Sequence, residues 1–100
     1  MSTKRRDAIK VLESIVGPLT FGRALESHRL SEEASLKDFA KFLGISPSAL
    51  CDLEKGRRIP SIARASSIAN KLKQHVGVWV QLAIQDQINE QGLKFKVSIA

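Results

Sequence analysis

Residues 35–61 read SLKDFAKFLGISPSALCDLEKGRRIPS, and this stretch decides the fold. Ser35, with Asp38 three residues after it, fits the capping box that begins many helices. Apolar residues then recur at helical spacing, at Leu36, Phe39, Ala40 and Leu43. Gly44 follows the last of them, where a helix commonly ends. The first half of the stretch therefore predicts one short amphipathic helix.

A second helix is predicted to begin after a very tight turn. Ser46 can cap it, and Pro47 suits its first position because the N–H that proline lacks would be unpaired there anyway. Leu50 and Leu53 form its apolar side, and Gly56 lies just past its end, where a left-handed residue is usually needed. Two short helices joined by such a turn form a helix-turn-helix, whose second helix enters the major groove in DNA-binding proteins.

Further helices are predicted on both sides of this stretch. One opens after Thr20, and its apolar side consists of Phe21, Ala24, Leu25 and His28. Another follows Pro60-Ser61, and its core positions are Ile62, Ala65, Ile68, Ala69 and Leu72. Residues 3–16 show helical spacing before Gly17-Pro18, and the residues around Trp79 predict a last helix that ends at Gly92. The chain is therefore predicted to be all-α.

Residues 20–74 resemble the Cro/CI-type (Xre) helix-turn-helix DNA-binding family, whose fold is a five-helix bundle. The resemblance rests on several pieces in register: Phe39-Ala40, the turn Leu43-Gly44-Ile45-Ser46, the pattern Leu50, Leu53, Glu54, Gly56, and Arg57 to Pro60. With the patterns on either side, it divides the chain into three predicted parts: an N-terminal helix at 1–19, a helix-turn-helix DNA-binding domain at 20–74, and an extension at 75–100 that holds the last helix and a short β-strand.

The resemblance also implies which residues contact DNA. Ser46, Lys55 and Arg57 would touch the phosphate backbone, and Ser35 and Arg58 complete the predicted interface. Four residues of the second helix would face base edges: Pro47, Ser48, Cys51 and Asp52. The Asp52 carboxylate could accept a hydrogen bond from a cytosine amino group, although it also repels phosphates.

A structural ion pair is implied as well. Arg29 and Glu54 fall where members of this family often place a partly buried pair that joins the helix after Thr20 to the second helix of the motif. Such a pair would hold the recognition helix against the rest of the bundle.

The charge of the chain agrees with a polyanionic partner. The 100 residues carry a net charge of +6, and residues 20–74 hold ten basic and six acidic side chains. This balance favours nucleic acid over membrane headgroups as the partner, and together with the helix-turn-helix it predicts double-stranded DNA. The longest apolar run, residues 76–80, is five residues long, so we expect no membrane segment and a cytoplasmic protein.

Catalysis and metal binding find little support in the residues. One cysteine and two histidines offer few soft ligands, so we expect no metal site and no cofactor. The chain shows no Ser/His/Asp or Cys/His set at suitable positions, no glycine-rich phosphate loop and no paired carboxylates that the helices would bring together. We therefore expect that the protein is not an enzyme.

The end of the chain changes its pattern from helical spacing to period two. Leu93, Phe95, Val97 and Ile99 alternate with polar residues, which predicts a half-buried strand. No other strand is predicted in the chain, and an unpaired strand leaves its backbone hydrogen bonds unmade, so we expect it to pair with another chain. Trp79 is predicted either to lie in the core or to join these four residues in a dimer or partner contact.

Two functions remain open at this point. The first is a repressor that binds a palindromic operator as a homodimer, with the strand of each copy paired to the other. The second is an antitoxin that neutralises a cognate toxin and represses its own operon, because the extension is similar to those of HigA- and HipB-like antitoxins. Both hypotheses require DNA binding. A small neighbouring open reading frame whose product co-purifies with this chain would favour the antitoxin.

Overall fold

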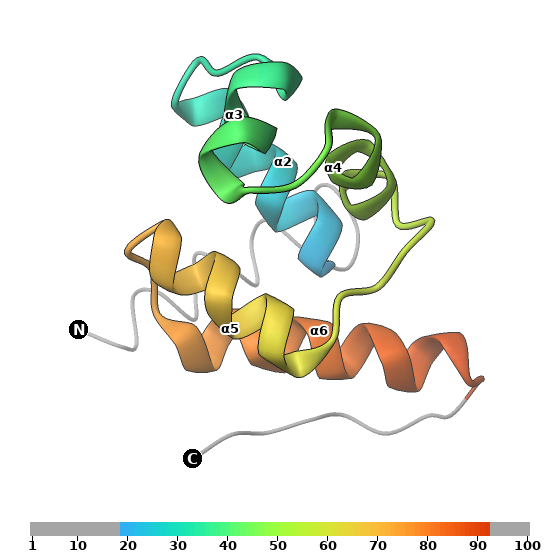
Figure 1. Cartoon of the computed structure of the whole chain (residues 1–100). Coiled ribbons are helices and arrows are strands. Elements are labelled where there is room, and N and C mark those ends of the chain that lie inside the picture. Colours follow the sequence, from blue (N-terminus) through green and yellow to red (C-terminus); the bar gives the residue numbers. More distant parts are fainter. Residues whose placement is uncertain (1–18, 93–100) are drawn as a thin grey trace.

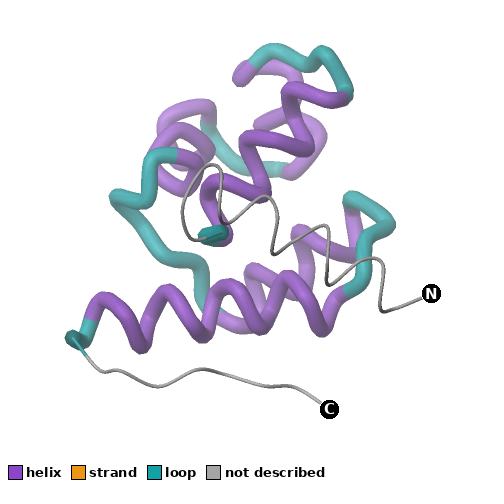
Figure 2. Tube along the Cα trace, turned by 180° about the vertical axis from the view of Figure 1, so that it is seen from behind, coloured by secondary structure: helices purple, strands orange, loops and turns teal. Residues whose placement is uncertain are grey.

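The computed structural model describes residues 19–92, which form five α-helices joined by short loops (Figure 1). The helices are α2 (Phe21–Ser31), α3 (Leu36–Leu43), α4 (Pro47–Glu54), α5 (Ile62–Lys71) and α6 (Val76–Glu90). Residues 19–92 contain no strand (Figure 2), and the predicted all-α bundle is confirmed. The N-terminal helix predicted within residues 1–19 falls almost entirely, and the strand of residues 93–99 entirely, outside the described residues.

Side-chain caps define where the helices begin. Ser35 accepts a hydrogen bond from the Asp38 N–H, and Ser46 accepts one from the Ala49 N–H, both at 3.0 Å. Each bond satisfies one of the N–H groups that the first turn of a helix leaves without an internal partner. Thr20 and Ser61 cap α2 and α5 in the same way. The helix starts predicted at residues 20, 35, 46 and 61 are thus confirmed.

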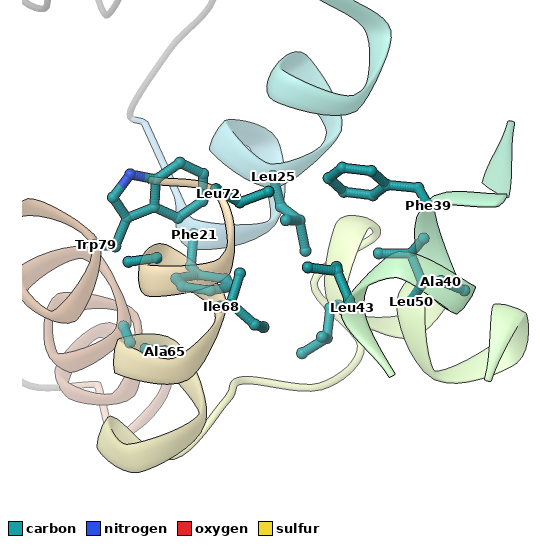
Figure 3. Packing of buried hydrophobic residues seen from close by; sticks show 13 residues of the cluster. Phe21, Leu25, Phe39, Ala40, Leu43, Leu50, Ala65, Ile68, Leu72 and Trp79 are labelled. Carbon is teal, nitrogen blue, oxygen red and sulfur yellow. The ribbon is translucent and has the colours of Figure 1, made fainter. Parts of the chain in front are cut away.

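A single core lies between two groups of helices. In Figure 1, α3 and α4 lie against α2 on one side, and α5 lies along α6 on the other. Side chains of α2, Phe21 and Leu25, point into the space between these groups and are fully buried (Figure 3). The Phe21 ring meets the Trp79 ring edge to face, with 5.4 Å between the ring centroids. Trp79, predicted as a dimer or partner contact, is buried in this core within its own chain.

Polar contacts join the last helix to α2 and to the loop that follows α4. The Phe21 N–H, at the start of α2, donates a hydrogen bond of 2.9 Å to Asp86 Oδ2 in α6. Gln87 Nε2 donates to the Pro60 carbonyl oxygen, in the loop that follows α4. Residues of the predicted 75–100 extension are therefore part of the same packed unit as α2 and α4.

Asp86 makes the stability of this unit depend on pH. Partial burial raises the pKa of the Asp86 carboxyl, and the hydrogen bond from Phe21 only partly offsets this. The folded state therefore binds the Asp86 proton more tightly than the unfolded state does, so its contribution to stability rises as pH falls through the folded pKa. We expect wild type to gain free energy of unfolding relative to Asp86→Asn between about pH 7 and pH 4. Urea unfolding of both proteins across this range measures the difference, and a difference that stays constant or shrinks would contradict the expectation.

Candidate nucleic-acid interface

The turn between α3 and α4 is held in place from two sides. Gly44 takes up the left-handed conformation, with φ of 76°, and ends α3. The Ile45 N–H donates to the Ala40 carbonyl oxygen at 3.0 Å, which closes the turn. Lys71 in α5 donates from Nζ to the Leu43 carbonyl oxygen at 2.6 Å, so a cation satisfies an end carbonyl of α3. This contact anchors the turn to α5 and was not anticipated from the sequence.

The two sides of α4 differ in what they contact. Leu50 and Leu53 are buried against the core, as their spacing predicts. The opposite side carries exposed Pro47 and Ser48 and partly exposed Cys51 and Asp52. The four residues predicted to face base edges therefore share one outward surface of the helix. Ser46 and Lys55 are exposed at its two ends, and Ser35 is exposed at the start of α3.

A buried ion pair fixes α4 against α2. Arg29 Nε lies 2.8 Å from Glu54 Oε2, and Arg29 Nη2 donates to Glu54 Oε1 at 3.1 Å, which makes the pair bidentate. The side chains expose 12% and 2% of their surface, so little water screens the two charges. Arg29 Nη1 also donates to the Ala34 carbonyl oxygen, and the hydrogen bond to Glu54 raises the pKa of the guanidinium. One side chain thus joins α2, α4 and the loop before α3.

A close approach of α2 to α4 depends on Gly22. A Cβ added to Gly22 would lie 2.2 Å from the Leu53 carbonyl oxygen and 2.8 Å from that of Glu54. Sequence reasoning missed this residue, although a signal was present. Glycine is unfavourable inside a helix. A glycine at the second position of a predicted helix therefore indicates a place where another backbone comes close.

Arg57 folds back onto α4 from the loop that follows it. Its Nε donates to Asp52 Oδ1 at 2.9 Å, and its Nη2 donates to Cys51 Sγ at 3.4 Å. The Asp52 hydrogen bond raises the pKa of the Arg57 guanidinium. The resemblance placed Arg57 on the phosphate backbone, and that placement stays a prediction. The structure brings all three side chains together on the outward side of α4.

Two arginines flank the start of α4. A depression of about 190 Å³ lies beside the α3–α4 turn, and it is lined by Gly44, Ile45, Ser46, Ala49, Leu53, Arg58 and Arg64. Both arginines are exposed, and neither forms an ion pair with any residue of the described part of the chain. Guanidinium groups next to the free N–H groups at the start of a helix are suited to bind a phosphate group. Arg58 was predicted as a DNA contact, whereas Arg64 was not in that set.

Other kinds of site were sought over the same residues. Within 19–92, no group of three or more His, Cys, Asp or Glu side chains is arranged to hold a metal ion. None of the five helices has both the length and the apolar character needed to span a bilayer.

Comparison with known proteins agrees with this geometry. A family model described as helix-turn-helix matches residues 25–79, which is more than half of the chain and includes all of α3, α4 and α5. No curated protein matches the sequence. The matched region contains both halves of the motif, the Arg29–Glu54 pair and the outward surface of α4. The chain therefore belongs to the Cro/CI-type (Xre) helix-turn-helix family of DNA-binding transcription regulators.

Proposed function

We propose that the protein is a sequence-specific repressor that acts in the cytoplasm as a homodimer on a palindromic operator. The observation that carries the proposal is the two-sided construction of α4. Its inner side is fixed by Leu50, Leu53 and the bidentate Arg29–Glu54 pair, while the side chains of its outer side are exposed or partly exposed. A rigid helix with an open polar surface has the geometry of major-groove recognition.

Basic side chains around α4 supply affinity without sequence preference. Arg58 and Arg64 lie beside the start of the helix and Lys55 lies at its end. The two arginines can neutralise phosphates directly, and Lys55 can do so by exchanging its long, exposed contact with Glu26, 3.8 Å from Nζ to Oε2, for a phosphate. Such contacts set the register of the protein on the duplex. The base edges are then left to the outward side chains of α4.

A homodimer follows from the small size of this surface. One short helix reads only a few base pairs, and two copies related by a two-fold axis read two half-sites one helical turn apart. A dimer bound across a promoter would exclude RNA polymerase from it. Light scattering of the purified protein with and without operator DNA measures the stoichiometry. A single copy per operator would contradict the homodimer, and a co-purifying product of a neighbouring reading frame would support the antitoxin instead.

Selection from random duplex DNA tests the repressor proposal. We expect the purified protein to enrich a sequence with dyad symmetry. A dimer that neutralises three phosphates per subunit should show a slope of about −5 in a plot of log affinity against log salt concentration. Random sequence recovered without enrichment would contradict the proposal.

A matched pair of variants tests where the phosphate contacts lie. Arg58→Ala should reduce the magnitude of the salt slope by about 2 in the dimer, because one phosphate contact per subunit is lost. Lys73→Asn removes the same charge from the loop between α5 and α6, which lies away from α4 (Figure 1), and asparagine tolerates the left-handed φ of 56° found there. Fluorescence anisotropy titrations at several salt concentrations measure both slopes. Equal slopes for Arg58→Ala and Lys73→Asn would place the phosphate contact elsewhere.

A further inference from the structure

The loop after α4 wraps back over the last turn of the helix. Gly56 takes up a left-handed conformation with φ of 76°, and it reverses the chain just after Lys55. The N–H groups of Arg57 and Arg58 then both donate to the Asp52 carbonyl oxygen, at 2.9 and 3.2 Å. The backbone of Arg57 is therefore fixed before its side chain makes any contact.

The Arg57 side chain lies along the outward side of α4 in one defined orientation. Its Nε and one Nη2 hydrogen face the helix, where they bind the Asp52 carboxylate and the Cys51 sulfur. A guanidinium carries five N–H donors in a plane. The Nη1 hydrogens and the second Nη2 hydrogen have no partner among the described residues. One flat edge of the guanidinium is thus bound, and its end, formed by Nη1 and Nη2, is open.

The pairing with Asp52 makes Arg57 a poor ligand for phosphate. The carboxylate 2.9 Å from Nε balances the charge of the guanidinium, so the pair as a whole attracts phosphate weakly. Arg58 and Arg64, beside the start of α4, have no carboxylate partner in the described part of the chain and are therefore better ligands for phosphate. What Asp52 gives Arg57 is a fixed orientation, and orientation matters for reading a base edge.

A fork of two N–H donors matches one base edge in the major groove. Guanine presents O6 and N7 there as two neighbouring acceptors, and arginine binds both at once. We propose that Arg57 reads one guanine in each half-site through Nη1 and Nη2, and that Asp52 is the positioning residue that holds the guanidinium in place. This inference rests on the DNA-binding function proposed above. It replaces two expectations from the sequence, a backbone contact for Arg57 and a cytosine contact for Asp52.

Selection from random duplex DNA with wild type first identifies the half-site. The affinity is then measured, by fluorescence anisotropy at one salt concentration, for the selected operator and for operators in which each guanine in turn is replaced by adenine. We expect Arg57→Lys to lose roughly 10- to 100-fold of the discrimination at one guanine position, because lysine keeps the charge but lacks the fork. Asp52→Ala should reduce discrimination at the same position. Arg58→Lys makes the same change at the neighbouring arginine that is assigned to phosphate, and any change in affinity should be by the same factor for every operator.

The possible results distinguish a failure of this inference from a failure of the proposed DNA-binding function. All of the altered residues are at least partly exposed, and circular dichroism confirms that each variant is folded. If wild type enriches a dyad but Arg57→Lys keeps every base preference, Arg57 is not the reader and only this inference is overturned. If Asp52→Ala instead abolishes a preference for cytosine that Arg57→Lys retains, Asp52 contacts the base itself and the inference is again overturned. If wild type enriches no sequence, the proposed function and this inference are both wrong.

Discussion

Glu54→Ala should lower the free energy of unfolding by about 3 to 5 kcal/mol, which is a large fraction of the stability of a domain of this size. The Glu54 side chain exposes 2% of its surface and accepts two hydrogen bonds from Arg29. Its removal leaves the Arg29 guanidinium nearly buried without a counter-charge, and an uncompensated buried charge is costly. Urea unfolding followed by circular dichroism measures the change, because urea, unlike guanidinium chloride, does not screen charges.

Two controls separate the loss of the charge partner from other effects. The double variant Arg29→Met with Glu54→Leu replaces the ion pair by apolar side chains, and it should recover most of the lost stability. Asp52→Ala breaks the exposed Arg57–Asp52 pair, in which Arg57 exposes 60% of its side chain, and it should cost far less stability than Glu54→Ala because solvent screens the pair. A Glu54→Ala protein within about 1 kcal/mol of wild type would show that water reaches the Arg29 guanidinium and solvates it.

The Arg29–Glu54 pair also affects DNA recognition, and the Arg29→Met, Glu54→Leu double variant separates this effect from stability. The bidentate geometry joins two rigid planar groups and so fixes the rotation of α4 about its own axis as well as its distance from α2. Apolar side chains of similar volume restore the distance but not the directional bonds. The outward residues of α4 depend on that rotation for their approach to base edges. Stability and DNA discrimination can therefore separate in the double variant.

Local signals in the sequence were sufficient for most of the fold. Caps at Ser35, Ser46 and Ser61 and the left-handed glycines at 44 and 56 act within one helical turn, so the pattern of neighbours along the chain is enough to locate them. The apolar spacing located the core for the same reason. These features predict an all-α bundle with α3 and α4 as a helix-turn-helix, as the structure shows.

The site depended on contacts that the sequence pattern does not contain. Lys71 reaches the Leu43 carbonyl oxygen across 28 positions of the chain, and no periodicity predicts which lysine does so. The family resemblance assigned Arg57 to phosphate, and that assignment stays a prediction. Its contact within the chain depends on how Gly56 turns the backbone and on an acidic residue at position 52 of the preceding helix. The net charge favoured a polyanionic partner, but only geometry shows which charges are already paired.

Among glycine-to-alanine substitutions in the described part of the chain, Gly22→Ala should cause the largest loss of stability. Alanine is normally the better helix residue by about 1 kcal/mol, so at an ordinary helical position this substitution would stabilise the protein. At Gly22 the new Cβ would lie 2.2 Å from the Leu53 carbonyl oxygen. That atom belongs to the backbone and has no rotamer to relieve the overlap, so α2 and α4 must move apart. We expect a loss of at least about 3 kcal/mol in the free energy of unfolding.

Two further substitutions to alanine isolate the cause of that loss. Ser27→Ala, at an exposed position of the same helix, should leave stability unchanged or raise it by about 0.5 kcal/mol. Gly56→Ala places a Cβ with no atom within 4 Å, so its cost of about 1 kcal/mol reflects only the left-handed backbone. Urea unfolding of the three variants gives their order directly. A Gly22→Ala protein as stable as wild type would mean that α4 can shift outward without cost, and the outward surface of a helix so loosely held could not discriminate between base sequences.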